Sequence, residues 1–317
     1  MGCPICSVSP ASLSFATQLL ATTSAPKSAT LTNTGNATMS ITSIRVTGTN
    51  PGDFTQSNTC STSLAVGAKC TISASFKPTA KDKRTAAVSI ADNAAPPNPQ
   101  SLGLTGTGTE VKLSPTSIVF STQVVGIKSS AKVVTLTNVG TTPLSIASVA
   151  LTGLNASDYA QTNTCGSTVA ARATCTISVT FTPKAAGTRT GSLSITDNGG
   201  ASPQLVSLSG TGTVVKLVPT SLSFGSQKVG TTSAPKSVTM TNVGTTVLTI
   251  NGISLTGTNA GDFSQTHTCG GTLGAGASCT ISVTFHPSAT GTRSAALSIS
   301  DNGGGSPQKV PLSGTGT

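Results

Sequence analysis

The sequence is poor in aromatic and acidic side chains. It contains no tryptophan, 1 tyrosine and 8 phenylalanines, and only 8 aspartates and glutamates in 317 residues. Few aromatic rings leave little material for base stacking, and no segment shows the periodicity of a recognition helix, so specific nucleic-acid binding is not expected. Apolar runs are short as well, and none is long enough to form a transmembrane segment.

Groups that carry acid–base chemistry are also scarce. Six of the acids fall at two repeated positions, which favours a structural role that every repeat shares. The acids are Asp53, Asp82, Asp92, Glu110, Asp158, Asp197, Asp262 and Asp301. The two histidines, His267 and His286, have no fixed carboxylate or cysteine beside them, and no hydrolase elbow, metal-binding helix or phosphate loop is present. We therefore predict that the protein is not an enzyme, with no catalytic residue, no metal ligand and no cofactor.

The repeated acids suit turns. Asp53, Asp158 and Asp262 each precede an aromatic residue in a glycine-containing loop, and Asp92, Asp197 and Asp301 each precede an asparagine before a turn. In both contexts a carboxylate can cap backbone N–H groups. Calcium is the alternative, but it usually takes roughly six to eight oxygens including several carboxylates, and the linkers between repeats contain a single acid, Glu110. We favour the turn.

What the sequence does contain is a threefold repeat. Cysteine pairs recur with steps of 105 and then 104 residues, and phenylalanines and prolines keep the same steps. The recurring phenylalanines that precede a proline by two residues are Phe76, Phe181 and Phe285. A period of this length is too long for a solenoid unit and suits a self-contained domain. We predict three domains, at residues 1–107, 108–211 and 212–317.

Each repeat shows the periodicity of strands. In the second repeat, Cys175, Ile177, Val179 and Phe181 alternate with threonine and serine, which is typical of a half-buried strand. Turn residues such as Asn198-Gly199-Gly200 separate these runs. About seven short strands per repeat predict an all-β chain of three tandem immunoglobulin-like antiparallel β-sandwich domains. A barrel is the alternative.

The third repeat carries residues that resemble a known family. They are the run from Gly257 to Phe263, then Cys269, Leu273, Gly276, Cys279, Ile281, Val283, Phe285, Pro287, Gly291, Arg293, Leu297, Ile299, Asp301 and Asn302. This pattern resembles the abnormal-spindle and hydin (ASH) type of immunoglobulin-like domain, whose bacterial members often carry the label choice-of-anchor D, and the resemblance covers all three repeats. It implies a sandwich similar to that of major sperm protein, no shared catalytic site, and tandem use in secreted or surface bacterial proteins or in eukaryotic ciliary and centrosomal ones.

The paired cysteines indicate an oxidising compartment. In each pair the second cysteine opens an alternating strand and the first closes the preceding loop, so a disulfide would close a short loop. Free buried thiols are one alternative, and a zinc site is another that would need ligands from a neighbouring repeat. We predict structural disulfides and therefore a secreted or cell-surface location. The predicted pairs are Cys60 with Cys70, Cys165 with Cys175, and Cys269 with Cys279.

The first six residues contain two further cysteines, Cys3 and Cys6. Ser7 follows where haem attachment requires a histidine, and Cys6 stands where myristoylation requires serine or threonine. We predict a terminal disulfide for this pair, either local or intermolecular. A basic region followed by an apolar stretch is lacking, so we expect export to depend on a segment outside this sequence.

Charge and linkers bear on the partners. The net charge of +10 is scattered along the repeats and predicts weak, salt-sensitive attraction to anionic polysaccharide, with solubility alone as the alternative. Short Gly-Thr-Gly-Thr linkers place the domains close together. We predict an extracellular structural or adhesive spacer of a cell-surface or appendage protein, whose partners are copies of itself or other surface proteins. The alternatives are a glycan- or protein-binding module and a eukaryotic ciliary or cytoskeletal scaffold.

The two ends of the sequence match the internal junctions. Residues 314–317 repeat the Gly-Thr-Gly-Thr that elsewhere leads into a domain, and Cys3 and Cys6 align with Gly108 and Val111. A contact between such ends would propagate as a filament unless it closed into a ring. We therefore expect head-to-tail assembly that Cys3 or Cys6 could lock covalently.

Overall fold

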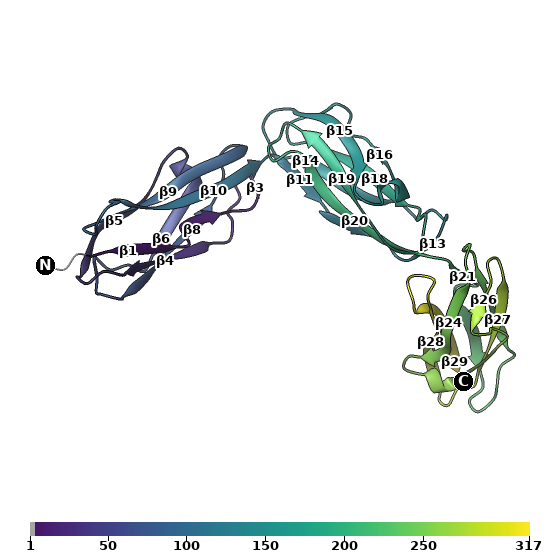
Figure 1. Cartoon of the computed structure of the whole chain (residues 1–317). Coiled ribbons are helices and arrows are strands. Elements are labelled where there is room, and N and C mark those ends of the chain that lie inside the picture. Colours follow the sequence, from purple (N-terminus) through teal and green to yellow (C-terminus); the bar gives the residue numbers. More distant parts are fainter. Residues whose placement is uncertain (1–3) are drawn as a thin grey trace.

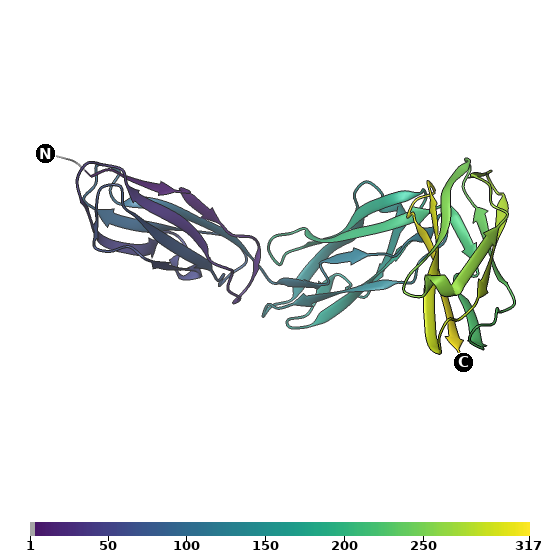
Figure 2. The same cartoon turned by 90° about the horizontal axis from the view of Figure 1, so that it is seen from below.

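The computed structural model describes residues 4–317 and contains three β-sandwiches in a row (Figure 1). The first two sandwiches lie nearly in line when seen from below, and the third turns away from that line (Figure 2). The predicted all-β fold of tandem immunoglobulin-like sandwiches is confirmed.

The first sandwich contains two sheets, ordered β1-β4-β8-β6 and β2-β10-β9-β5-β7, with β3 beside β10. Its elements are β1 (Cys6–Ser9), β2 (Ser12–Ser14), β3 (Gln18–Leu19), β4 (Lys27–Asn33), β5 (Met39–Thr47), the 3-10 turn η1 (Pro51–Asp53), β6 (Phe54–Asn58), β7 (Ser63–Leu64), β8 (Lys69–Phe76), β9 (Asp82–Asp92) and β10 (Gln100–Thr109).

The other two sandwiches repeat this order. The second contains β11 (Val111–Ser114), β12 (Ser117–Val119), β13 (Gln123–Val124), β14 (Lys132–Asn138), β15 (Leu144–Thr152), η2 (Ala156–Asp158), β16 (Tyr159–Asn163), β17 (Thr168–Val169), β18 (Thr174–Phe181), β19 (Gly187–Asp197) and β20 (Gln204–Thr213). The third contains β21 (Val215–Val218), β22 (Leu222–Gln227), β23 (Lys236–Asn242), β24 (Leu248–Thr256), η3 (Ala260–Asp262), β25 (Phe263–His267), β26 (Thr272–Leu273), β27 (Ser278–Phe285), β28 (Gly291–Asp301) and β29 (Gln308–Gly316).

One pairing differs from a purely antiparallel sandwich. After β1 the chain crosses to the other sheet, where β2 and β3 lie parallel to β10. In the second sandwich β12 and β13 pair with β20 in the same way, and in the third β22 pairs with β29. These short crossing strands and the two-residue strands, such as β7, raise the number of strands above the predicted seven per repeat.

The alternating patterns form the cores. In β18 the side chains of Cys175, Ile177, Val179 and Phe181 are buried, while the residues between them face outward, as the period of two predicts. Each sandwich has one such cluster of buried apolar residues. Backbone packs directly on the aromatic rings, because a Cβ added at Gly210 would lie 2.6 Å from the ring of Phe181.

A disulfide lies in each sandwich. The bonds join Cys60 to Cys70, Cys165 to Cys175, and Cys269 to Cys279, which are the pairs that the spacing predicted. In every case the second cysteine is buried in the strand that carries the core phenylalanine. The bond therefore ties a surface loop to the centre of the sandwich.

Replacing Cys165 and Cys175 with alanine should lower the free energy of unfolding of the second sandwich by about 2.5–3 kcal/mol, because an 11-residue loop is no longer closed in the unfolded chain. Tyr159, the one tyrosine, is buried in that sandwich, so tyrosine fluorescence during guanidinium denaturation reports on it selectively. Cys6→Ser is the control and should leave the unfolding of the second sandwich unchanged, because Cys6 lies in the first sandwich. A decrease in the free energy of unfolding of less than ~0.5 kcal/mol in the double variant would contradict the stabilising role of the disulfide.

Candidate functional site at the interdomain joints

The first set of repeated acids forms a buried ion pair in each sandwich. Arg189 Nε lies 2.6 Å from Asp158 Oδ2, and the equivalent pairs are Arg84 with Asp53 and Arg293 with Asp262. The carboxylates are nearly inaccessible, whereas the arginines keep about a fifth of their side-chain surface. Capping of backbone N–H groups was predicted for these acids, but their arginine partners were missed.

In the first and third sandwiches these contacts shift the pKa of the carboxyl group, that of Asp53 and that of Asp262. For Asp262 the hydrogen bond from Arg293 lowers the pKa below its ordinary value despite burial. For Asp53 burial raises the pKa, but hydrogen bonds from Thr79 and Arg84 outweigh it, so the net shift is also downward. A lowered pKa means that the ionised carboxylate stabilises the fold at neutral pH, and that this stability is lost as pH falls through the folded-state pKa.

The second set of acids caps turns, as predicted. Asp92, Asp197 and Asp301 each accept a backbone N–H two residues ahead at 2.7 Å. Burial raises the pKa of Asp197 and Asp301. Their second oxygens, Oδ2, have no hydrogen-bond partner within residues 4–317. These carboxylates shape the loops that follow β9, β19 and β28, and the loops after β19 and β28 contact the preceding sandwich.

Arg293→Met should destabilise the third sandwich by about 3 kcal/mol at neutral pH, because it leaves the charge of Asp262 buried without a partner. The penalty should shrink as pH falls, since a protonated Asp262 carries no charge to bury. Hydrogen exchange of the core amides in β28 measures this sandwich alone. Arg45→Met, at an exposed arginine of the first sandwich, is the matched control. A penalty that is the same at pH 7 and at pH 4 would contradict the ion-pair explanation.

The two histidines lie apart from any cluster of side chains that could bind a metal ion within residues 4–317. His267 Nδ1 lies 3.0 Å from the carbonyl oxygen of Cys269, and His286 Nδ1 lies 3.1 Å from Thr232 Oγ1, both within the third sandwich. Among residues 4–317 there is no group of three histidine, cysteine or acidic side chains that could hold a metal ion. No helix in the same range has the length and apolarity that a membrane crossing requires.

Of the two cysteines near the amino terminus, the structure describes only Cys6. Cys3 lies outside the described residues. Cys6 lies at the start of β1 as a partly buried free thiol, with Sγ 4.0 Å from Asp92 Oδ2. Burial, and then the charge of Asp92, raise the pKa of Cys6 to about 11, so its thiol stays protonated at neutral pH. The terminal disulfide, local or intermolecular, remains a prediction.

The joints between sandwiches are the most specific arrangement in the molecule. Strand β10 ends at Thr109 and β11 begins at Val111, while β20 ends at Thr213 and β21 begins at Val215. One residue therefore separates the last strand of a sandwich from the first strand of the next. The boundaries predicted after residues 107 and 211 lie two residues inside β10 and β20.

A buried threonine hydroxyl organises the first joint. Thr109 is 4% exposed, and its Oγ1 donates to the carbonyl oxygen of Gly200 at 2.9 Å. The same oxygen accepts the backbone N–H of Val111 at 3.1 Å. The approach is close enough to require glycine, because a Cβ at Gly200 would lie 2.6 Å from the carbonyl oxygen of Gly108. The last residue of one sandwich is thus held in the β19–β20 loop of the next.

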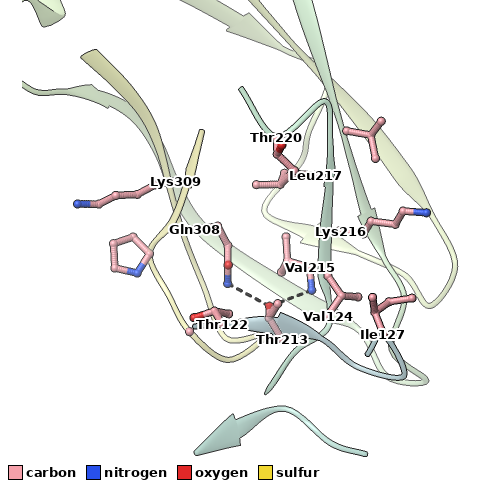
Figure 3. Close-up of a pocket in the computed structure, with 13 residues that line it drawn as sticks. Thr122, Val124, Ile127, Thr213, Val215, Lys216, Leu217, Thr220, Gln308 and Lys309 are labelled. Carbon is pink, nitrogen blue, oxygen red and sulfur yellow. Dashed lines mark hydrogen bonds between the residues drawn. The ribbon is translucent and has the colours of Figure 1, made fainter. Parts of the chain in front are cut away.

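The second joint repeats this arrangement (Figure 3). Thr213 is 3% exposed, and its Oγ1 accepts the N–H of Val215 at 3.1 Å and lies 3.2 Å from Gln308 Nε2. Gln308 also donates to the carbonyl oxygen of Gly304 at 2.7 Å. Gln204 makes the equivalent bond to Gly200 in the second sandwich. Threonine and glutamine therefore connect neighbouring sandwiches at both joints, although only the Gly-Thr linkers were noticed in the sequence.

The two joints differ in their surroundings. At the first, Lys81 Nζ donates to the carbonyl oxygen of Asn198 at 2.6 Å and lies 3.8 Å from Glu110 Oε2, so a side chain of one sandwich binds the next. The equivalent positions at the second joint hold Ala186 and Val214, which carry no charge.

The second joint instead borders an apolar groove of about 630 Å³ (Figure 3). Its walls come from both sandwiches and consist of Thr122, Val124, Ile127, Thr213, Val215, Lys216, Leu217, Val218, Thr220, Gly305, Pro307, Gln308 and Lys309. The groove contains no carboxylate, and it was not anticipated from the sequence.

Internal use of the acids leaves the surface basic. Three acids pair with arginine inside the sandwiches, three cap turns, and Glu110 faces Lys81. Only Asp82 is an exposed acid without such a role. Fourteen lysines and arginines form no ion pair within residues 4–317.

Combining Lys81→Ala with Glu110→Val gives the first joint the residues of the second. We expect a change in the free energy of unfolding below ~1 kcal/mol, as for other partly exposed ion pairs, but a broader distribution of distances between the first two sandwiches. Pulsed EPR between spin labels on those sandwiches, with Cys3 and Cys6 replaced by serine, measures this. Labels on the second and third sandwiches are the control and should show no change. If the width of the distance distribution between the first two sandwiches did not change, the contacts of Lys81 with Asn198 and Glu110 would not hold the first joint.

Family models match two of the three repeats. Residues 109–205 match the model described as abnormal spindle-like microcephaly-associated, ASPM-SPD-2-Hydin, and residues 213–315 match the HYDIN/CFA65/VesB-like Ig-like domain. The resemblance stated from the sequence is confirmed, while the bacterial choice-of-anchor D subgroup is not addressed by these matches. Among curated proteins, none matches the sequence significantly.

Solved structures give only weak likenesses. A protein of unknown function from Porphyromonas gingivalis is 14% identical, with 65% of this chain and 99% of that chain covered and a TM-score of 0.29. An ASH/PapD-like domain of human CEP192 is 20% identical, with coverages of 33% and 86% and a TM-score of 0.24. The Escherichia coli adhesin FdeC is 16% identical, with coverages of 99% and 97% and a TM-score of 0.23. At these scores the likenesses carry no argument about function.

Proposed function

Repeats two and three belong to the abnormal-spindle and hydin type of immunoglobulin-like domain, and on this premise we propose that the chain is a non-enzymatic extracytoplasmic spacer of a cell-surface or appendage protein. Its role is to set a distance and to present loops along a row of sandwiches. The observation that carries the proposal is the joint, where one residue separates consecutive strands and a buried threonine fixes the next domain.

Joint geometry supports a spacer because a short, bonded connection limits the angles between neighbours. A flexible polar linker of many residues would behave as a random coil and transmit no orientation. Here Thr109 and Thr213 are both buried, and a glutamine of the following sandwich, Gln204 or Gln308, lies against each hydroxyl. The array therefore holds its domains in a defined sequence of orientations.

The location rests on the cysteines. Three disulfides, one in each sandwich, are typical of proteins that fold in an oxidising compartment. The basic surface adds a partner class to this proposal: anionic polysaccharide, attracted by exposed lysines and arginines that no acid neutralises. Other surface proteins remain part of the proposed partner set.

Head-to-tail assembly is the remaining part of the proposal. Gln100 of the first sandwich is equivalent to Gln204 and Gln308, the residues that approach the threonine of the preceding domain. Gln100 instead donates within its own loop, to the carbonyl oxygen of Pro97. We propose that a preceding domain, such as that of a second copy, can use this position as the internal joints do.

Small-angle scattering coupled to size-exclusion chromatography tests the spacer directly. We expect the monomer to scatter as an elongated row of three bodies, with a maximum dimension that stays constant between low and high salt. A compact particle would refute the spacer. The same runs test self-assembly. We expect a molecular mass that rises with protein concentration and that falls when Cys3 and Cys6 are replaced by serine. A strictly monomeric mass at all concentrations would refute self-assembly but not the spacer role.

A further inference from the structure

The groove at the second joint is bounded by a strand edge. All four residues of β21, Val215 to Val218, line it. Successive side chains of a strand point to opposite faces, so a cavity that contacts four in a row lies along the strand's edge and not on one face. That edge is open, because β21 is the outermost strand of the sheet ordered β21-β23-β27-β25.

A second strand edge closes the groove on the other side. Gln308 and Lys309 are the first two residues of β29, and Pro307 directly precedes them. On its β22 side, the pairing of β29 begins only at Leu312, so Gln308 to Pro311 have no ladder partner there within the described chain. The groove thus lies between two strand segments whose facing backbone edges are unpaired.

The side chains around these edges are apolar at the centre and basic at the flanks. Ile127 and Val218 are 54% and 52% exposed, although both are large aliphatic residues. Lys216 and Lys309 point away from the groove in opposite directions, so positive charge lies on both sides of it (Figure 3). No acid lines the groove to neutralise this charge.

We propose that this groove binds an extended peptide segment of another protein, in which aliphatic and acidic residues alternate, by adding it as a strand to the open edge of β21. Backbone hydrogen bonds to a strand edge supply affinity, and pockets for alternate side chains supply specificity. On the face of the edge that carries Val218, aliphatic side chains of the segment cover Val218 and Ile127. Its carboxylates project to the opposite face, toward Lys309, and Lys216 adds positive charge beside the strand. This binding activity goes beyond the spacer role, because it gives one joint a partner of its own.

The first joint offers a comparison within the same chain. Its positions equivalent to Ile127 and Val218 hold Thr22 and Ser114, and the position of Lys309 holds Leu205. The strand order is the same, but the two exposed aliphatic residues and one of the flanking charges are missing. Substitutions that copy the first joint therefore remove the proposed site with residues that the fold already accommodates.

The test uses the full chain and a synthetic peptide of roughly nine residues in which valine and glutamate alternate, followed by fluorescence anisotropy. Ile127→Thr combined with Val218→Ser should weaken binding by about tenfold or more, because exposed aliphatic surface is no longer available for burial. Lys216→Glu with Lys309→Glu should weaken it similarly and reduce its dependence on salt. Hydrogen exchange should show protection of residues 215–218 when the peptide binds.

Matched variants distinguish binding at this groove from non-specific binding of the peptide to exposed apolar or charged residues. Val133→Thr removes another exposed aliphatic residue, Lys69→Glu reverses another exposed charge, and neither should change the affinity. A peptide with lysine in place of glutamate should bind more weakly. Absence of binding, equal affinity in all variants, or protection elsewhere would overturn the proposal. Equal competition by dodecanoate without protection of β21 would also overturn it, since the groove would then be a site for amphiphiles.

Discussion

The arrangement of the chain depends on a hydroxyl group that is buried at the end of a strand. Thr109 and Thr213 complete the last strand of their own sandwiches, and their Oγ1 atoms also bond to the backbone at the start of the next. A polar group removed from water must be hydrogen-bonded, so the following domain has to be in place for the threonine to be satisfied. Each domain thus contributes one residue to the structure of its neighbour, and independent reorientation would leave that hydroxyl without its partner.

Scarcity of acids has a related consequence. Asp53, Asp158 and Asp262 pair with arginines inside the sandwiches, so three of the few acids are buried and the excess of lysine and arginine stays at the surface. A chain with equal numbers of acids and bases could not produce this result with the same core. The stabilising chemistry and the basic surface are therefore two outcomes of one composition.

The sequence predicted those features that repeat locally. Alternation in residues 174–181 predicted the buried face of a strand, and the fixed spacing of cysteines predicted the disulfides, because both signals lie within about ten residues. It did not predict that Asp158 would meet Arg189 or that β12 would lie parallel to β20, since those contacts join segments far apart in the chain. The groove could not be predicted from the sequence, because Ile127 and Val218 belong to different domains and only the angle at the joint brings them together.

The three repeats differ in charge where they meet. Core positions keep the same residue types, such as Phe76, Phe181 and Phe285, whereas the joints exchange Lys81 and Glu110 for Ala186 and Val214. A core position contacts its own repeat, so the same packing requirement applies in all three copies. A joint position contacts two repeats at once, so its requirements are set by a pair of domains and can change from one pair to the next. Specific chemistry in a tandem array of similar domains is therefore to be sought between the domains, in walls that neither domain has alone.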